Sequence, residues 1–119
     1  MWVGDVLQVY QAHFELPVLH RLYLAWQHND LAAVQTWDAF YQAGRDTAEA
    51  LAETKQMGYS LVRLLNDLNE LPEALLTNIN QLKTPAFPTI YAAVAQHWQI
   101  PAPDMLQGYA WGWLENQAS

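Results

Sequence analysis

The chain contains no cysteine and few charged residues, and both shortages exclude classes of function. Without cysteine there can be no disulfide, no thiolate metal ligand and no cysteine nucleophile. Charged residues make up 14% of the chain, against about 25% in ordinary globular proteins. Only five are Lys or Arg, and the net charge is −7, which argues against a nucleic-acid partner because such proteins need a basic face.

Long apolar runs and targeting signals are also missing. No apolar stretch reaches the ~18 residues that a membrane-spanning helix requires. The first residues lack the charged and apolar regions of a signal peptide. We therefore expect a cytoplasmic protein with no membrane partner.

Apolar and aromatic residues are abundant in place of charge. Hydrophobic residues form 52% of the chain, including six tryptophans and six tyrosines. So few charged residues can scarcely cover the surface of a monomer. The aromatic residues therefore either form an aromatic-rich core or lie on apolar surfaces that partners cover. The length of 119 residues predicts a single domain, residues 1–119.

The spacing of apolar residues predicts an all-α fold. No strand-length alternation and no internal repeat competes with the helical period. We expect an irregular bundle of about six or seven helices around one long central helix, about residues 46–68. The expected helices are 5–14, 17–27, 31–43, 46–68, 73–82, 88–98 and one from about 104, with an extended, proline-rich link at 100–103.

The central helix carries three rows of residues at helical spacing, each on its own face. The polar row is Arg45, Glu49, Glu53, Gln56, Ser60 and Arg63; the apolar row is Leu51, Leu61, Leu64, Leu65 and Leu68; the row of small residues is Ala50, Thr54 and Gly58. Glycine inside a helix costs about 0.5–1 kcal/mol relative to alanine. We expect the small row to receive a closely packed helix; the alternative is a tolerated defect or a helix break at Gly58.

Catalytic signatures are scarce in this sequence. It has no G-x-S-x-G, no phosphate-binding glycine loop and no H-E-x-x-H. No two of the four histidines, at positions 13, 20, 28 and 97, lie three or four residues apart, so no single helix presents a pair to a metal, and we expect neither a metal site nor a cofactor. Glu49 and Glu53 would need a cleft and separated pKa values to act as an acid–base pair. We favour a solvated or docking face for them.

Three segments, in order, resemble the urease accessory protein family UreF. Arg45-Asp46-Thr47-Ala48-Glu49, followed by Glu53 and Gln56-Met57-Gly58, is similar to the family's central signature; Asp46 stands for the usual Glu, and Ala50-Leu51 for Leu-Arg. Residues 15–23, ELPVLHRLY, resemble the family's D-L-P-L-L-A-R-L-Y segment, and residues 113–117 resemble a late helix. The chain corresponds to the family's central region, and we expect a fragment that lacks the family's terminal segments.

The resemblance implies an all-helical, non-enzymatic scaffold. It would join UreD (UreH in some species), recruit the GTPase UreG during nickel insertion into urease, and form homodimers. The matching positions Arg45, Glu49, Glu53 and Gln56 then become candidate partner-binding residues. Two alternatives from other classes are a small helical binding or dimerisation module unrelated to urease, holding an apolar ligand among Trp26, Trp37 and Trp98, and a hydrolase using Glu49 and Glu53.

Overall fold

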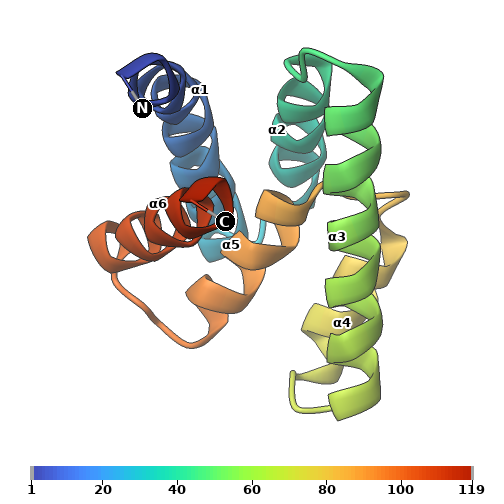
Figure 1. The fold of residues 1–119 in the computed structure, drawn as a ribbon. Helices are drawn as coiled ribbons and strands as arrows, with labels where there is room; N and C mark the ends of the chain where they lie inside the picture. The colour runs from blue at the N-terminus through green and yellow to red at the C-terminus, as the bar shows by residue number, and fades with distance from the viewer. Residues whose placement is uncertain (1, 119) are drawn as a thin grey trace.

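The structure is a computed structural model that describes the backbone of residues 2–118 and the side chains of residues 14–111. Within that range the chain forms six helices and no strand, which confirms the all-α prediction. The helices are α1 (Trp2–Gln27), α2 (Leu31–Ala43), α3 (Ala48–Leu68), α4 (Glu73–Gln81), α5 (Phe87–His97) and α6 (Ala102–Ala118) (Figure 1).

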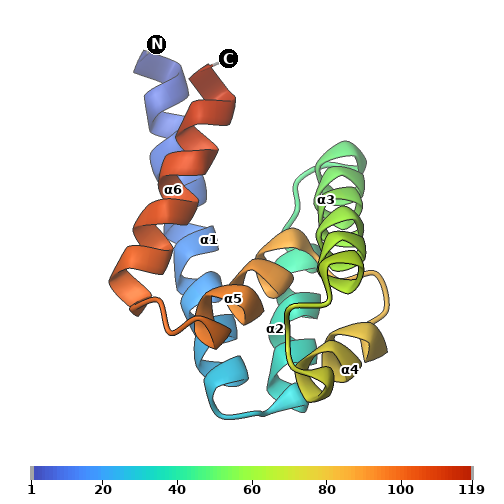
Figure 2. The same ribbon diagram turned by 90° about the horizontal axis from the view of Figure 1, so that it is seen from below.

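Helix α5 lies between the two ends of the molecule, packed against α1 on one side and α3 on the other (Figure 2). Helices α2 and α6 pack on α1, and α4 packs on α3. Helix α3 stands at one side of the ribbon (Figure 1), so its predicted central position is not confirmed.

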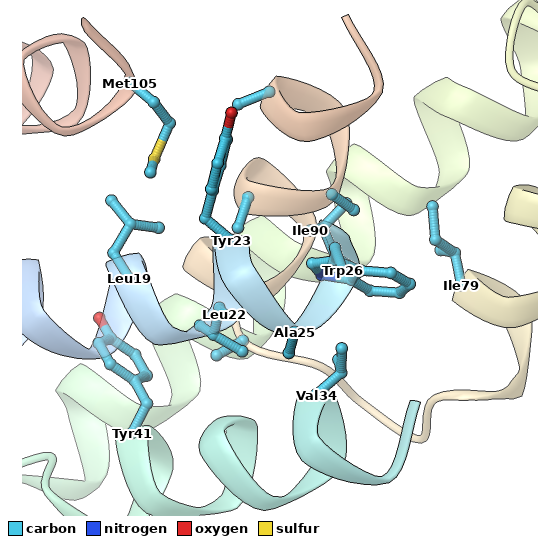
Figure 3. Packing of buried hydrophobic residues seen from close by; sticks show 14 of the residues in the cluster. Leu19, Leu22, Tyr23, Ala25, Trp26, Val34, Tyr41, Ile79, Ile90 and Met105 are labelled. Atoms are coloured by element: carbon cyan, nitrogen blue, oxygen red, sulfur yellow. The ribbon is translucent and has the colours of Figure 1, made fainter. Parts of the chain in front are cut away.

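The core is built mainly on the second half of α1, as Figure 3 shows. Leu19 and Leu22 are completely buried there, and Trp26 packs beside Ile90 of α5. The Trp26 Nε1–H donates a hydrogen bond of 2.9 Å to the carbonyl oxygen of Thr89. The indole can therefore be buried without leaving its one polar group unpaired.

Pro17 does not separate two helices as predicted; α1 runs through it from Trp2 to Gln27. Proline inside a helix removes one backbone hydrogen bond and costs ~3 kcal/mol. The next turns bury Val18, Leu19 and Leu22 in the core, and each buried side chain of this kind contributes about 1.5–3 kcal/mol. The residues before Pro17 are held as well, since Phe14 packs on the core and Glu15 accepts three hydrogen bonds. Contacts on both sides of Pro17 therefore offset the local cost and keep the helix continuous.

The predicted extended link at 100–103 is also wrong in its second half, because α6 begins at Ala102. Pro103 lies in the first turn, where a helix does not use the missing N–H. The first bond of the helix runs from the Met105 N–H to the Pro101 carbonyl oxygen at 2.9 Å. Met105 is buried at this point and fixes the start of α6 against α1.

Helix α3 begins and ends at residues suited to those positions. The Thr47 hydroxyl accepts the Ala50 N–H at 3.0 Å, so Thr47 is the N-cap and Asp46 lies outside the helix. At the other end Asn69 adopts a left-handed conformation, with φ 53°, which asparagine tolerates better than most residues. The two ends of a helix leave backbone groups without internal partners. Here the Thr47 hydroxyl pairs with the Ala50 N–H, and the Asn69 N–H pairs with the Leu65 carbonyl oxygen.

Candidate functional site

The two segments that contain Glu15 and Arg45 meet at a largely buried ion pair. Arg45 Nη1 lies 3.4 Å from Glu15 Oε2, and the two side chains are 14% and 5% exposed. The hydroxyls of Tyr41 and Tyr109 both donate to Glu15 Oε1, at 3.3 and 2.8 Å. A single carboxylate thus accepts three hydrogen bonds, from α2, α6 and the turn before α3. We call Glu15, Tyr41, Arg45 and Tyr109 the Glu15 cluster.

Arg45 belongs to this cluster and is set apart from the rest of its predicted row. It precedes α3, and its guanidinium carbon lies 4.1 Å from the ring centroid of Tyr41 and 5.4 Å from that of Phe14. An arginine over aromatic faces gains a further attraction when it is desolvated. Arg45 is therefore placed to brace α1 and α2, while Glu49, Glu53 and Gln56 lie on the exposed face of α3.

Burial governs the titration of the cluster tyrosines. Removal from water raises the pKa of the Tyr109 hydroxyl above its ordinary value, and the neighbouring Tyr41 and Glu15 add to the rise. Burial also raises the pKa of Tyr41; the Glu15 charge adds to this rise and the Arg45 charge partly offsets it. Both tyrosines stay protonated and donate to Glu15 at neutral pH.

The row of small residues on α3 lies against the segment that leads into α5. A Cβ added at Gly58 would stand 2.2 Å from the carbonyl oxygen of Pro85, which is backbone and has no rotamer to change. Four residues earlier, the Thr54 hydroxyl accepts the Phe87 N–H at 3.2 Å. Gly58 and Thr54 are buried and Ala50 is half-buried. The backbone at 85–87 can approach α3 this closely because the row offers so little side chain.

Asp38 of α2 holds the same segment from the other side. Its Oδ1 accepts the Ala86 N–H at 2.8 Å and the Thr89 hydroxyl, and its Oδ2 accepts the Gln42 amide at 2.9 Å. Burial raises the pKa of the Asp38 carboxyl, and these hydrogen bonds partly offset the rise. Asp38 and Thr54 together satisfy backbone N–H groups at the start of α5, where a helix has no internal partners.

The exposed part of the polar row contains Glu49, Glu53 and Gln56, each in contact with solvent. Gln56 donates to the Ser60 hydroxyl at 3.4 Å, a weak bond along the same face. Glu49 and Glu53 are both exposed, whereas an acid–base pair works in an enclosed site. Their setting suits a solvated surface or a docking face.

The remaining candidates are scattered. His20 and His28 are exposed and His97 is half-buried; His13 and residues 113–117 fall outside the described side chains. Among residues 14–111 no three His, Asp or Glu side chains come together as metal ligands would. Trp26 is buried in the core, Trp37 stacks edge-on with Phe40, and Trp98 is exposed.

Sequence reasoning missed Asp38 and the role of Glu15. Both had a signal: each is an acidic residue on an otherwise apolar helical face. Asp38 falls between Val34 and Tyr41 at helical spacing, and Glu15 stands three and four residues before Val18 and Leu19. An acidic side chain on a core-facing stripe must find partners, because an unpaired buried charge is too costly. The sequence alone does not say which partners.

The geometry defines an all-α protein held together by buried polar contacts between distant helices. A family model described as UreF matches residues 1–119. The chain is 59% identical over 118 residues to the urease accessory protein UreF of Methylobacillus flagellatus, and 48% identical over 119 residues to that of Azoarcus sp.. These alignments cover 99% and 98% of the chain but 52% and 50% of the relatives.

This chain belongs to the UreF family. It spans about half the length of the curated relatives that it matches. No solved structure matches it. Within the described residues, none of the helices combines the length and the apolar character needed to cross a membrane.

Proposed function

We propose that this chain is a non-enzymatic scaffold of urease maturation, which joins UreD (UreH) and recruits the GTPase UreG during nickel insertion. The observation that carries the proposal is the family match over residues 1–119. The relatives bear the name urease accessory protein. The proposal includes a homodimer and a cytoplasmic location, and it treats nickel as cargo rather than as a resident cofactor.

Within this proposal the exposed face of α3 is the docking face. Glu49, Glu53 and Gln56 are solvent-exposed on the helix that carries the family signature. The α3 backbone is held in place by Thr54 and Gly58 against the start of α5. Arg45 supports this face indirectly, by fixing the turn before α3 to Glu15.

Reversal of the two carboxylates tests the docking face. Glu49→Lys with Glu53→Lys should leave helicity and melting nearly unchanged, because exposed charges contribute only ~0–1 kcal/mol. The same change should abolish recovery of UreG and UreD in a pull-down and reduce urease activation in cells that express the urease genes, since like charges in an interface cost several kcal/mol. Glu70→Lys with Glu73→Lys, an equal charge change at exposed positions beyond the end of α3, is the matched control.

Normal recovery and activation by a folded Glu49→Lys, Glu53→Lys variant would refute docking at this face. Failure of the unaltered chain to bind either partner would refute the scaffold proposal itself.

A further inference from the structure

The apolar face of α3 is wider than the part of it that the rest of the molecule covers. Met57, Leu64 and Leu68 are 38%, 51% and 53% exposed. With the half-buried Leu61 they are spaced four, three and four residues apart, which aligns them along one edge of the helix. We call Met57, Leu61, Leu64 and Leu68 the α3 apolar strip.

The contacts of α3 explain why this strip stays open. The start of α5 lies over Gly58 and Thr54, and Leu65 faces the core on the same side. Helix α4 is joined to another side of α3, where the amides of Asn66 and Asn80 exchange two hydrogen bonds of 3.0 Å. Neither neighbour extends over Leu64 or Leu68, which remain about half exposed.

The border of the strip is acidic. Glu53 and Asp67 lie along its solvent side, seven residues on either side of Ser60, and all three are exposed. Arg63 lies on the next row of the helix, further from the strip than Glu53 and Asp67. The chain as a whole has five basic residues and a net charge of −7. An occupant of the strip therefore meets a row of leucines edged by negative charge.

This border argues against a second copy of the chain as the occupant. Apolar residues spaced alternately four and three apart form the contact line of two paired helices. The residues that flank this line face the flanking residues of the partner helix. Antiparallel pairing would bring Glu53 of one copy close to Asp67 of the other, and parallel pairing would align each with its own equivalent. Like charges facing each other across an interface disfavour the pairing. An anionic membrane surface is disfavoured for the same reason.

We propose that the α3 apolar strip receives an amphipathic helix of a partner protein that carries Lys or Arg beside its apolar residues. Leucines of that helix would pack on Leu61, Leu64 and Leu68, and its basic residues would pair with Glu53 and Asp67. Helix-in-groove recognition of this kind uses anchors at helical spacing, with charge selecting the partner. The inference rests on the proposed function in one respect: it adds an apolar component and a partner chemistry to the docking face.

Two synthetic peptides provide the probe. Each has three heptads with leucine at the seam positions, flanked by lysine in one peptide and by glutamate in the other. Fluorescence anisotropy would measure their binding to the 119-residue chain. We expect the lysine peptide to bind at least tenfold more tightly at low salt, and the preference to vanish near 1 M salt, where charges are screened beyond ~3 Å. Equal binding of the two peptides at low salt would overturn the proposal.

Variants then locate the binding. Leu64→Ser with Leu68→Ser should weaken binding of the lysine peptide at least tenfold. Tyr59→Ser alters another exposed side chain of α3, at 59% exposure, and should leave this binding unchanged. Glu53→Lys with Asp67→Lys should transfer the preference to the glutamate peptide, and it leaves the strip intact. Unchanged binding by the serine variant, or an unchanged preference in the lysine variant, would place the peptide elsewhere and overturn the proposal.

The peptide result and the proposed function can fail separately. If the unaltered chain recovers UreD and UreG and the folded serine variant recovers them equally, the strip is not the docking site but the scaffold stands. If the unaltered chain recovers neither partner, the scaffold fails whatever the peptides do.

Discussion

The Glu15 cluster and the outer face of α3 use their residues in opposite ways. In the cluster, a carboxylate is buried and a guanidinium is largely buried, at 5% and 14% exposure, where apolar residues would be expected. On α3, Leu64 and Leu68 are about half exposed, where polar residues would be expected. The comparison suggests that charge is used inside the molecule to join distant helices, and that apolar surface is left outside for binding.

The two regions should therefore differ in what their mutation changes. Loss of a buried charge partner leaves an uncompensated charge in the interior, so stability suffers. Loss of an exposed leucine removes little that the fold uses, so binding suffers instead. Glu15→Ala should have the largest effect on stability, and replacement of the exposed leucines of α3 should have the smallest; a change at the buried side of α3 lies between them.

Glu15→Ala should lower the free energy of unfolding by about 3 kcal/mol, because it leaves the largely buried Arg45 without its carboxylate. It also removes the acceptor of the Tyr41 and Tyr109 hydroxyls. Urea unfolding followed by circular dichroism measures the loss. Glu53→Ala, which removes an exposed carboxylate, should change the same quantity by less than ~1 kcal/mol. Similar small losses for both variants would contradict a structural role for the ion pair.

Gly58→Ala should destabilise the chain by about 1–3 kcal/mol, although alanine favours a helix by ~1 kcal/mol over glycine. The new methyl group would meet the Pro85 carbonyl oxygen, and the backbone must move to admit it. Ser60→Ala on the exposed side of α3 should be neutral or slightly stabilising. A higher melting temperature for Gly58→Ala would show that no close contact exists at this row.

Alkaline pH should weaken the Glu15 cluster. The pKa values of Tyr41 and Tyr109 are raised in the folded chain above the unfolded value of 10.0. Their contribution to stability is then fully present below pH ~10 and is lost as pH rises above it. The free energy of unfolding should fall between pH 9 and 11 by urea titration, and Tyr41→Phe with Tyr109→Phe should flatten that fall. Tyr59→Phe, at an exposed position, is the control; an equal slope in both variants would contradict the prediction.

Leu64→Ser with Leu68→Ser should change the free energy of unfolding by no more than about 1 kcal/mol, since surface substitutions usually have small effects. Its helicity by circular dichroism should match that of the unaltered chain. A loss comparable to that of Glu15→Ala would mean that these leucines belong to the core, and the contrast between the two regions would disappear.

The sequence predicted the helices and their rows better than it predicted their neighbours. The helical spacing of apolar residues and the capping residues correctly predicted the bounds of α2, Leu31–Ala43, and the end of α3 at Leu68, because both depend on local sequence. It failed at Pro17 and at Pro103, where burial and position in the helix override the usual effect of proline. It could not pair Glu15 with Tyr109, which lies 94 residues away. It also could not divide the apolar row of α3 into the buried Leu65 and the exposed Leu64.

The most informative measurement is the recovery of UreD and UreG by the Leu64→Ser, Leu68→Ser variant in a quantitative pull-down beside Tyr59→Ser. The serine variant should fold normally and recover at least tenfold less of a partner, while Tyr59→Ser should recover as much as the unaltered chain. Equal recovery by the two variants would contradict this prediction, because the exposed leucines of α3 would then have no role in binding.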